Sequence, residues 1–199
     1  MNPESVVSAS KLLDSIMESA AKRFSIYGFR RTTVDEIARD LHISKKTLYT
    51  VFASKDAILR EVAWRDVTEI VREFNENLPV GLPSERIIVE FCRHIMNDRT
   101  KEGTTGCFRG LFSEDGDISA AYRASVARIL SALYRDGMTR GSCKPAEPDL
   151  AADIIMSMVL TATGTFHTYA RPAAVFTLTL DMIADAIAWT NRAQYDAKA

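Results

Sequence analysis

Apolar residues recur along the chain at the spacing of amphipathic helices, in segments separated by proline and glycine. No segment shows the sustained two-residue alternation of β-branched residues that indicates a strand. All six prolines lie at breaks or at the N-terminus, and several glycines, Gly137 among them, also lie at breaks. The pattern predicts an all-α protein of about nine helices. We expect these helices at residues 8–27, 33–41, 44–52, 54–77, 84–99, 106–114, 118–137, 148–170 and 172–192.

Two short helices joined by a tight turn are predicted between residues 33 and 52. Thr33 followed by Glu36 is a capping box, in which each side chain binds the backbone amide of the other residue. Ser44 is a good N-cap for the second helix. His42 falls at the turn, where a left-handed backbone is expected, and histidine tolerates a positive φ better than most residues other than glycine.

The second of these helices has a cationic, hydroxyl-rich face. Leu48, Val51 and Phe52 share one side of it and predict the packed side. The rest of the helix has no carboxylate between positions 44 and 53. Lysine donates to guanine O6 and N7, and hydroxyl groups donate to phosphates. The residues opposite or beside the packed side are Lys45, Lys46, Tyr49 and Thr50. This combination indicates a helix that lies in the major groove of double-stranded DNA.

Ser54 and Lys55 begin the third helix of this region. A cation in a first helical turn opposes the helix dipole. A phosphate bound at that N-terminus would relieve the conflict, although Asp56 already offsets part of it.

A long first helix followed by GFRRTTVDEIARDLHISKKTLYTVFASKDAIL strongly resembles the TetR family of bacterial transcriptional regulators, over residues 10–60. The glycine that the family commonly has at the turn is His42 here. The resemblance implies a dimeric regulator, usually a repressor, that a small molecule releases from its DNA operator. Base-edge contacts are expected from Lys45, Lys46 and Thr50. Phosphate contacts are expected from Thr33, Thr47, Tyr49 and Lys55.

Charge is distributed as this interpretation requires. The net charge of the chain is −1, but residues 22–60 hold nine Lys or Arg and four Asp or Glu, a net charge of +5. The remaining residues after position 60 are acidic, which keeps them off DNA. Residues 1–20 lack a secretory signal, and the most apolar stretch, residues 154–166, is too short to span a membrane. We expect a cytoplasmic protein without a membrane association.

We expect two domains: a three-helix helix-turn-helix DNA-binding domain at residues 1–54, and a helical effector-binding and dimerisation domain at residues 55–199. The helix at 54–77 crosses this boundary and would act as a lever. The last two helices are apolar over most of their surface, more than one small core requires. We therefore expect a homodimer through residues 148–192, with burial inside a single subunit as the alternative.

The middle region carries polar and aromatic residues on helices, and the family uses this region as an effector cavity. Such a cavity suits a small hydrophobic or aromatic effector. The alternative is that these side chains are ordinary core. The candidate pocket residues are Trp64, Cys92, Met96, Cys107, Phe108, Phe112, Phe166 and His167.

Nothing in the sequence predicts an enzyme, a metal or a cofactor. Glu114, Asp115 and Asp117 are adjacent carboxylates, but they fall in a glycine-containing loop and are expected to be solvated. No P-loop, dinucleotide fingerprint or nucleophile elbow is present. The three cysteines fit no metal motif or disulfide framework. Two alternatives to a ligand-released regulator stay open: a regulator that responds to oxidation of Cys107 or Cys92, and a helical interaction protein that has lost operator binding.

Overall fold

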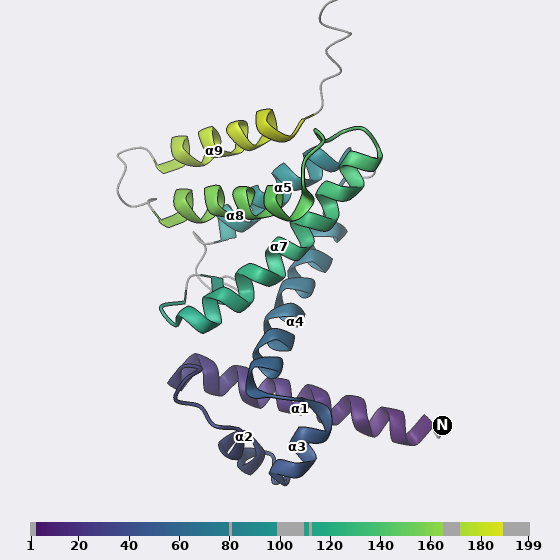
Figure 1. Cartoon of the computed structure of the whole chain (residues 1–199), viewed down its shortest axis with the longest axis vertical. Coiled ribbons are helices and arrows are strands. Elements are labelled where there is room, and N and C mark those ends of the chain that lie inside the picture. Colours follow the sequence, from purple (N-terminus) through teal and green to yellow (C-terminus); the bar gives the residue numbers. More distant parts are fainter. Residues whose placement is uncertain (1–2, 80, 99–109, 112, 165–171, 189–199) are drawn as a thin grey trace, which may run out of the picture. The chain divides into compact units, whose positions relative to one another are not determined.

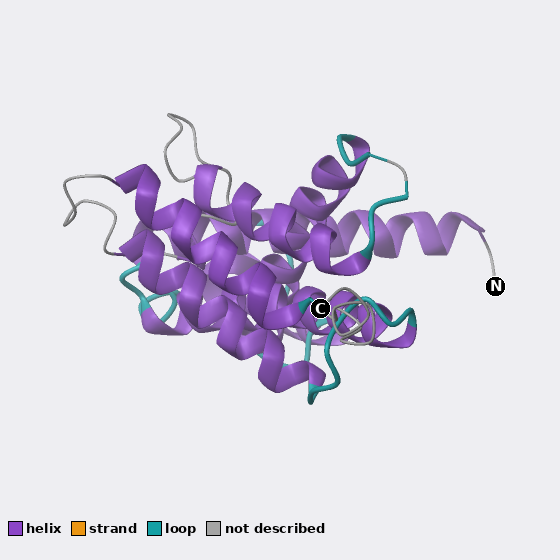
Figure 2. Ribbon diagram, turned by 90° about the horizontal axis from the view of Figure 1, so that it is seen from above, coloured by secondary structure: helices purple, strands orange, loops and turns teal. Residues whose placement is uncertain are grey.

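The computed structural model describes residues 3–79, 81–98, 110–111, 113–164 and 172–188, and the described part of the chain is built from helices (Figure 1, Figure 2). It contains no β-strand, only an isolated bridge between Cys143 and Ala188. The helices are α1 (Pro3–Tyr27), α2 (Val34–Asp40), α3 (Lys45–Val51), α4 (Lys55–Glu76), α5 (Ser84–Asp98), α7 (Gly116–Thr139), α8 (Pro148–Gly164) and α9 (Pro172–Ile187). The predicted all-α class is confirmed.

Most helix ends lie close to the predicted positions. The start of α1 is an exception: the helix begins at Pro3, five residues before position 8. Proline is compatible with a first helical position because its fixed φ is helical and its missing amide hydrogen is not needed there. Most of the helix predicted at 106–114 lies outside the described residues, although residues 110 and 111 are helical.

Gly137 does not interrupt a helix, and the prediction of a break there is wrong. It lies inside α7, and a Cβ at this position would lie 2.3 Å from the Sγ atom of Cys143. The helix ends instead in a Schellman motif, with Gly141 at a φ of +72°. The amide of Ser142 donates to the Gly137 carbonyl at 2.8 Å, and that of Gly141 donates to the Met138 carbonyl at 3.1 Å. Gly137 is required because the chain folds back onto its own helix.

The chain divides into two compact units, one of residues 1–71 with 109–125 and one of residues 72–108 with 126–199. This division differs from the boundary expected at residue 54. The first part of α4 and the beginning of α7 belong to the same unit as the two short helices.

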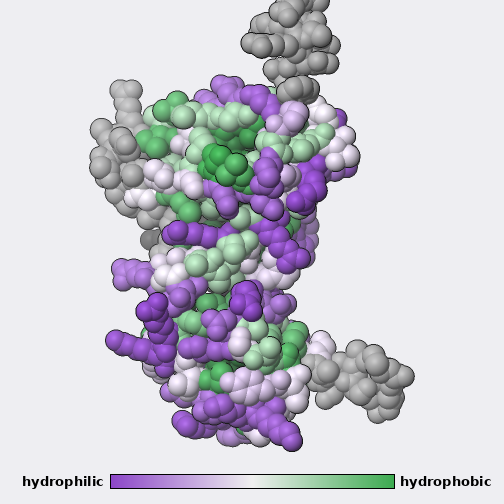
Figure 3. Space-filling model, in the orientation of Figure 1, coloured by the Kyte–Doolittle hydropathy of each residue, from purple (hydrophilic) through white to green (hydrophobic). Residues whose placement is uncertain are grey.

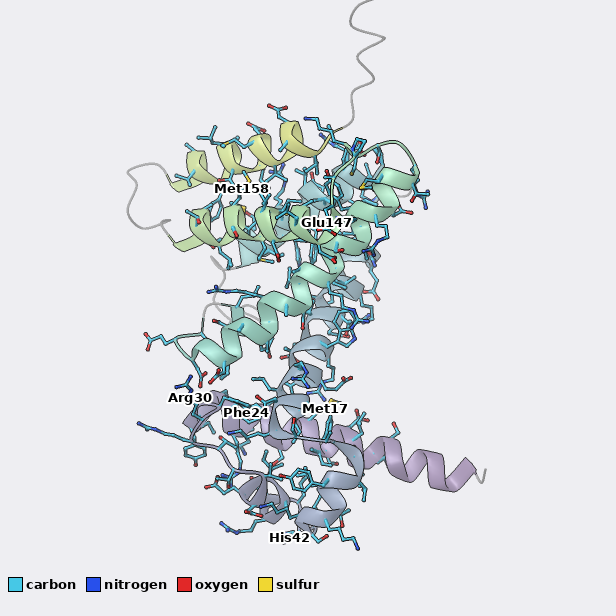
Figure 4. All side chains as sticks on the ribbon, in the orientation of Figure 1. Met17, Phe24, Arg30, His42, Glu147 and Met158 are labelled. Carbon is cyan, nitrogen blue, oxygen red and sulfur yellow. The ribbon has the colours of Figure 1, made fainter. Side chains whose placement is uncertain are left out.

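The core of the first unit brings together the apolar sides of α1, α2, α3 and α4. From α1 it takes residues that include Met17 and Phe24, which Figure 4 labels on that helix. The short helices contribute Ile37 and Leu48, which are fully buried. A small residue, Ala38, is 3% exposed, as a close helix crossing requires. The predicted packed side of the second short helix is therefore confirmed at Leu48 and Phe52.

In the second unit α5 packs on α8 and α9, and α8 packs on α9. The fully buried residues Ile88, Met96, Val159 and Ile183 come from these three helices. The end of α9 is hydrogen-bonded to the segment that follows α7: the Lys144 amide donates to the Ile187 carbonyl at 2.8 Å. Figure 3 shows hydrophobic residues at the surface over α8 and α9 as well.

Candidate nucleic-acid interface

The capping box at the start of α2 is present as predicted. The Thr33 amide donates to Oε2 of Glu36 at 2.8 Å, and the Glu36 amide donates to the Thr33 hydroxyl oxygen at 3.3 Å. These hydrogen bonds hold the pKa of the Glu36 carboxyl below its ordinary value. The Thr33 hydroxyl also lies 2.8 Å from Oε2 of Glu36 and donates to it. Its single proton is therefore already used, and the phosphate contact expected from Thr33 has no support in this geometry.

His42 forms the turn between α2 and α3, and its φ is +54°. The expected left-handed conformation is confirmed. The Ile43 amide donates to the Ala38 carbonyl at 3.0 Å, and the His42 amide donates to the Arg39 carbonyl at 3.1 Å. These two bonds make a Schellman motif in which His42 takes the position that glycine usually occupies. In Figure 4 His42 lies at the tip formed by the two short helices.

Helix α3 is capped by Ser44, whose hydroxyl accepts from the Thr47 amide at 2.9 Å. Leu48 and Phe52 are buried, so the opposite side of α3 faces the solvent. Its exposed residues are Lys45, Lys46, Tyr49 and Thr50. Thr47 is half-buried, and its hydroxyl is hydrogen-bonded to the Ser44 hydroxyl at 2.8 Å. The predicted cationic and hydroxyl-rich face is present on one side of an exposed helix.

The lysines of this face differ in their partners. The Nζ atom of Lys45 lies 2.9 Å from Oδ2 of Asp35, and this contact raises the pKa of Lys45. Both side chains are more than half exposed, so the ion pair is weak and a phosphate or a base can replace it. Lys46 is exposed and forms no hydrogen bond or ion pair within the described part of the chain.

Lys55 is held by the protein itself. Its Nζ donates to the Phe29 carbonyl at 2.8 Å and to the Thr32 carbonyl at 2.9 Å, and it lies 4.2 Å from the centre of the Phe29 ring. These carbonyls relieve the conflict between the cation and the dipole of α4, so no phosphate is needed for that purpose. An ammonium has three hydrogens, and one remains for DNA. The helix dipole therefore no longer supports a phosphate at Lys55, and the phosphate contact implied by the family resemblance stays a prediction.

Asp115 stabilises the chain between α1 and α2, a role that the sequence did not indicate. It is half-buried, and its Oδ2 accepts from the Phe29 amide at 2.7 Å. Its Oδ1 accepts from the amides of Asp117 and Ile118 at 3.1 and 3.4 Å, which caps α7. The Asp117 carboxylate lies 2.8 Å from the Arg30 guanidinium. The expectation that Asp115 is merely solvated is therefore wrong, because the carboxylate joins the end of α1 to the start of α7.

Only some residues of the effector pocket expected from the sequence lie within the described residues. Cys92 and Met96 are fully buried in the second unit, and Trp64 is half-buried in the first. The other expected pocket residues lie outside the described residues: Cys107, Phe108, Phe112, Phe166 and His167.

Burial raises the pKa of the Cys92 thiol to about 12. The thiolate is the form that reacts with oxidants, so the burial of Cys92 disfavours its oxidation at neutral pH. The second described cysteine, Cys143, is also buried, and desolvation raises its pKa. For a regulator that responds to oxidation, Cys107 is therefore favoured over Cys92.

Two hollows in the second unit could hold small molecules. One has a volume of about 610 Å³ and lies between the end of α4 and α5, where Phe74 and His94 have their rings 5.7 Å apart. Arg86 and Arg93 also line it. The other, of about 520 Å³, lies on α8 and α9 and includes Ile154, Met158 and Met182. Among the described residues no cluster of three or more His, Cys, Asp or Glu could hold a metal ion. Nor is any described helix long and apolar enough to cross a membrane.

Comparison with known proteins places these features in a family context. Residues 16–62 match the family model described as bacterial regulatory proteins, tetR family. The chain is 24% identical over 153 residues to the uncharacterised HTH-type transcriptional regulator YhgD of Bacillus subtilis (strain 168), a match that covers 73% of this chain and 78% of that protein. It is 29% identical over 150 residues to the A-factor receptor protein of Streptomyces griseus, covering 72% of this chain and 50% of that protein. The match thus spans half the length of the Streptomyces protein.

A solved structure shares the fold over nearly the whole chain. This is the crystal structure of Thermus thermophilus FadR, a TetR family transcriptional repressor, in complex with lauroyl-CoA. Its TM-score to this chain is 0.55 at 18% identity, and the match covers 87% of this chain and 94% of that chain.

Proposed function

Since the chain belongs to the TetR family of bacterial transcriptional regulators, we propose that it is a dimeric repressor whose α3 enters the major groove of an operator and which a small molecule releases. The observation that carries this proposal is the exposed face of α3. It presents two lysines and two hydroxyl groups on a helix whose opposite side is buried. A helix with this face can read base edges and bind phosphates at the same time.

Selection of bound sequences from a random DNA pool tests the proposal. The full chain should enrich a palindromic sequence, because a two-fold symmetric dimer binds two half-sites. Its affinity for the enriched DNA should fall steeply with salt, because phosphate contacts release counterions. Enrichment of no sequence, or binding that salt does not weaken, would favour the interaction protein that has lost operator binding.

The dimer we propose forms through residues 148–192. Leu150 and Ile154 on α8 are 59% and 53% exposed, and Leu178 and Met182 on α9 are 61% and 53% exposed. Large apolar side chains this exposed on two packed helices are typical of a protein–protein interface. The hollow of about 520 Å³ on the same two helices gives a second copy a concave surface to fill.

For the effector we propose a small hydrophobic or aromatic molecule that binds in the second unit. FadR binds lauroyl-CoA, a molecule with a long apolar chain, and its fold is the one found here. The buried Cys92 and Met96 are the described members of the expected pocket in this unit. Met96→Trp should fill such a pocket and reduce release of DNA by an effector found in a library screen. Unchanged release would point to the hollow beside Phe74 and His94 instead.

A response to oxidation is the second candidate, and the burial of Cys92 favours Cys107 as the residue that is oxidised. Peroxide should then release DNA from the wild type and leave the Cys107→Ser variant bound. We propose no enzymatic activity, since regulators of this family act by binding DNA, and we place the protein in the cytoplasm, where bacterial operators are.

A further inference from the structure

The connection between α1 and α2 is held from two sides. Gly28 ends α1 with a φ of +82°, and its amide donates to the Phe24 carbonyl at 3.0 Å. On the next residue, the Phe29 amide donates to Asp115 and the Phe29 carbonyl accepts from Lys55. One carboxylate and one ammonium, both distant in the sequence, therefore fix the two polar groups of a single residue.

Asp115 uses its two oxygens for two different elements. Oδ2 accepts from the Phe29 amide at 2.7 Å, and Oδ1 accepts from the first amides of α7 at 3.1 and 3.4 Å. A carboxylate at a helix N-terminus is also favoured by the helix dipole. This single side chain therefore links the segment that leads into α2 to the first turn of α7.

The surroundings make the link to Phe29 strong. Phe29 is 6% exposed, and Ile118, in the first turn of α7, is 8% exposed. Hydrogen bonds to a charged acceptor are stronger than neutral ones, above all where water is scarce. A Cβ on Gly28 would lie 3.1 Å from Oδ2, so the close approach of the carboxylate depends on glycine at this position. The neighbouring pair of Arg30 and Asp117 is exposed, and an exposed pair contributes little.

We propose that Asp115 is a positioning residue for operator binding. This inference rests on the proposed function. Phe29 lies four residues before Thr33, the N-cap of α2, and α3 follows α2 after one tight turn. The direction in which the chain leaves α1 therefore sets the direction of α3. Helix α7 continues past Ser125 into the second unit. A movement of α7 that displaces its first turn would therefore reach α3 through Asp115. This residue lies outside residues 16–62, which match the family model.

The variant Asp115→Asn separates the two roles. Asparagine is as good an N-cap as aspartate, so it can keep α7 capped. Its single acceptor oxygen cannot also serve Phe29, to which it would present its NH2 group. Asp115→Ser is a second variant, which caps α7 with a side chain too short to reach Phe29. The matched control is Glu114→Gln, the same chemical change one residue away on an exposed side chain that has no hydrogen bond or ion pair among the described residues.

Two measurements test the inference: amide exchange of Phe29 in the DNA-free protein, and Kd for DNA selected by the wild type. Both are made at a temperature where circular dichroism shows each variant to be folded. Loss of a charge-assisted hydrogen bond should speed exchange and raise Kd by about tenfold each, with Glu114→Gln unchanged. A purely structural role would lower stability and leave the Kd of the folded protein unaltered.

The outcomes are distinguishable. A wild type that selects no DNA would overturn the proposed function and this inference with it. A variant that loses protection at Phe29 yet binds the selected DNA within twofold of the wild type would overturn this inference alone. So would unchanged exchange at Phe29, because the hydrogen bond would then not restrain the chain.

Discussion

Lys45, Lys46 and Lys55 lie close together in the sequence, yet their ammonium groups have different surroundings. Lys45 pairs with an exposed carboxylate, and Lys55 is bound by two backbone carbonyls. Lys46 has neither kind of partner among the described residues. A substitution of each lysine therefore tests a different property: partner exchange at Lys45, DNA contact at Lys46 and domain stability at Lys55.

Replacing Lys46 by alanine should change recognition and leave stability alone. The side chain is exposed and opposite the buried side of α3, so the free energy of unfolding should change by less than about 0.5 kcal/mol. Loss of a base contact should cost roughly 1–3 kcal/mol and relax the preference at one symmetric operator position. Selection from a random pool, wild type against variant, measures this preference. An unchanged sequence preference would show that Lys46 supplies only charge, and base contacts would then fall to Lys45 and Thr50.

Replacing Lys55 by methionine should lower stability, because the carbonyls of Phe29 and Thr32 lose their donor. The expected loss is about 1–3 kcal/mol of unfolding free energy, measured by chemical denaturation. Lys46→Met is the matched control, because it makes the same change on a lysine that has no hydrogen bond or ion pair among the described residues. Unchanged stability would contradict this structural role. If Lys55 also contacts a phosphate, Lys55→Met should in addition lower the salt slope of DNA binding by about one per half-site.

At the scale of elements, the sequence predicts α2 and α3 within one or two residues. The signals that define these helices are local: Thr33 with Glu36, Ser44 with the Thr47 amide, and a left-handed residue between them. Each lies within a few positions of the group it binds. The helical fold class and the exposed cationic face of α3 follow from the same short-range chemistry.

Features that depend on distant contacts could not be predicted in this way. The partner of Asp115 is an amide 86 positions away, and the carbonyls that bind Lys55 lie 26 and 23 positions away. A glycine at position 137 suggested a helix break. The structure shows instead that a side chain there would meet Cys143, a contact that exists only because the chain folds back after α7. Tertiary packing decides such positions, and neither periodicity nor composition records it.

Gly137→Ala tests this packing within α7. Alanine favours a helix over glycine by about 1 kcal/mol, but the new methyl group would meet Cys143. We expect a net destabilisation of roughly 1–3 kcal/mol in chemical denaturation, typical of overpacking. Gly116→Ala is the control, since a Cβ there has open space and should not destabilise. Adding Cys143→Ala to Gly137→Ala should recover part of the loss, because it removes the Sγ contact but leaves the Cβ atoms of Cys143 and Ser84 each 3.1 Å from the new methyl group. A stabilised single variant would contradict the packing argument.

At the scale of the whole molecule, the operator binding that we propose depends on the dimer that we propose. A symmetric dimer presents two copies of α3 to two half-sites, so each phosphate contact counts twice in the salt dependence. A monomer would retain the exposed face of α3 but would lose half of these contacts. The exposed apolar side chains on α8 and α9 should therefore matter for DNA binding through the dimer that we propose.

Leu150→Glu combined with Leu178→Glu should convert a dimer into a monomer. In a two-fold symmetric interface each substitution occurs twice, so four carboxylates would have to be buried without partners. Sedimentation at micromolar concentration should give about twice 22.1 kDa for the wild type and about 22.1 kDa for the variant. Ile26→Glu is the control, because Ile26 is 59% exposed but lies on α1, outside this surface. The monomer should bind the selected DNA with roughly half the salt slope of the wild type, because it contacts one half-site. A wild type that sediments as a monomer, or a double variant that stays dimeric, would place the subunit contact elsewhere and remove the basis for two-half-site binding through α8 and α9.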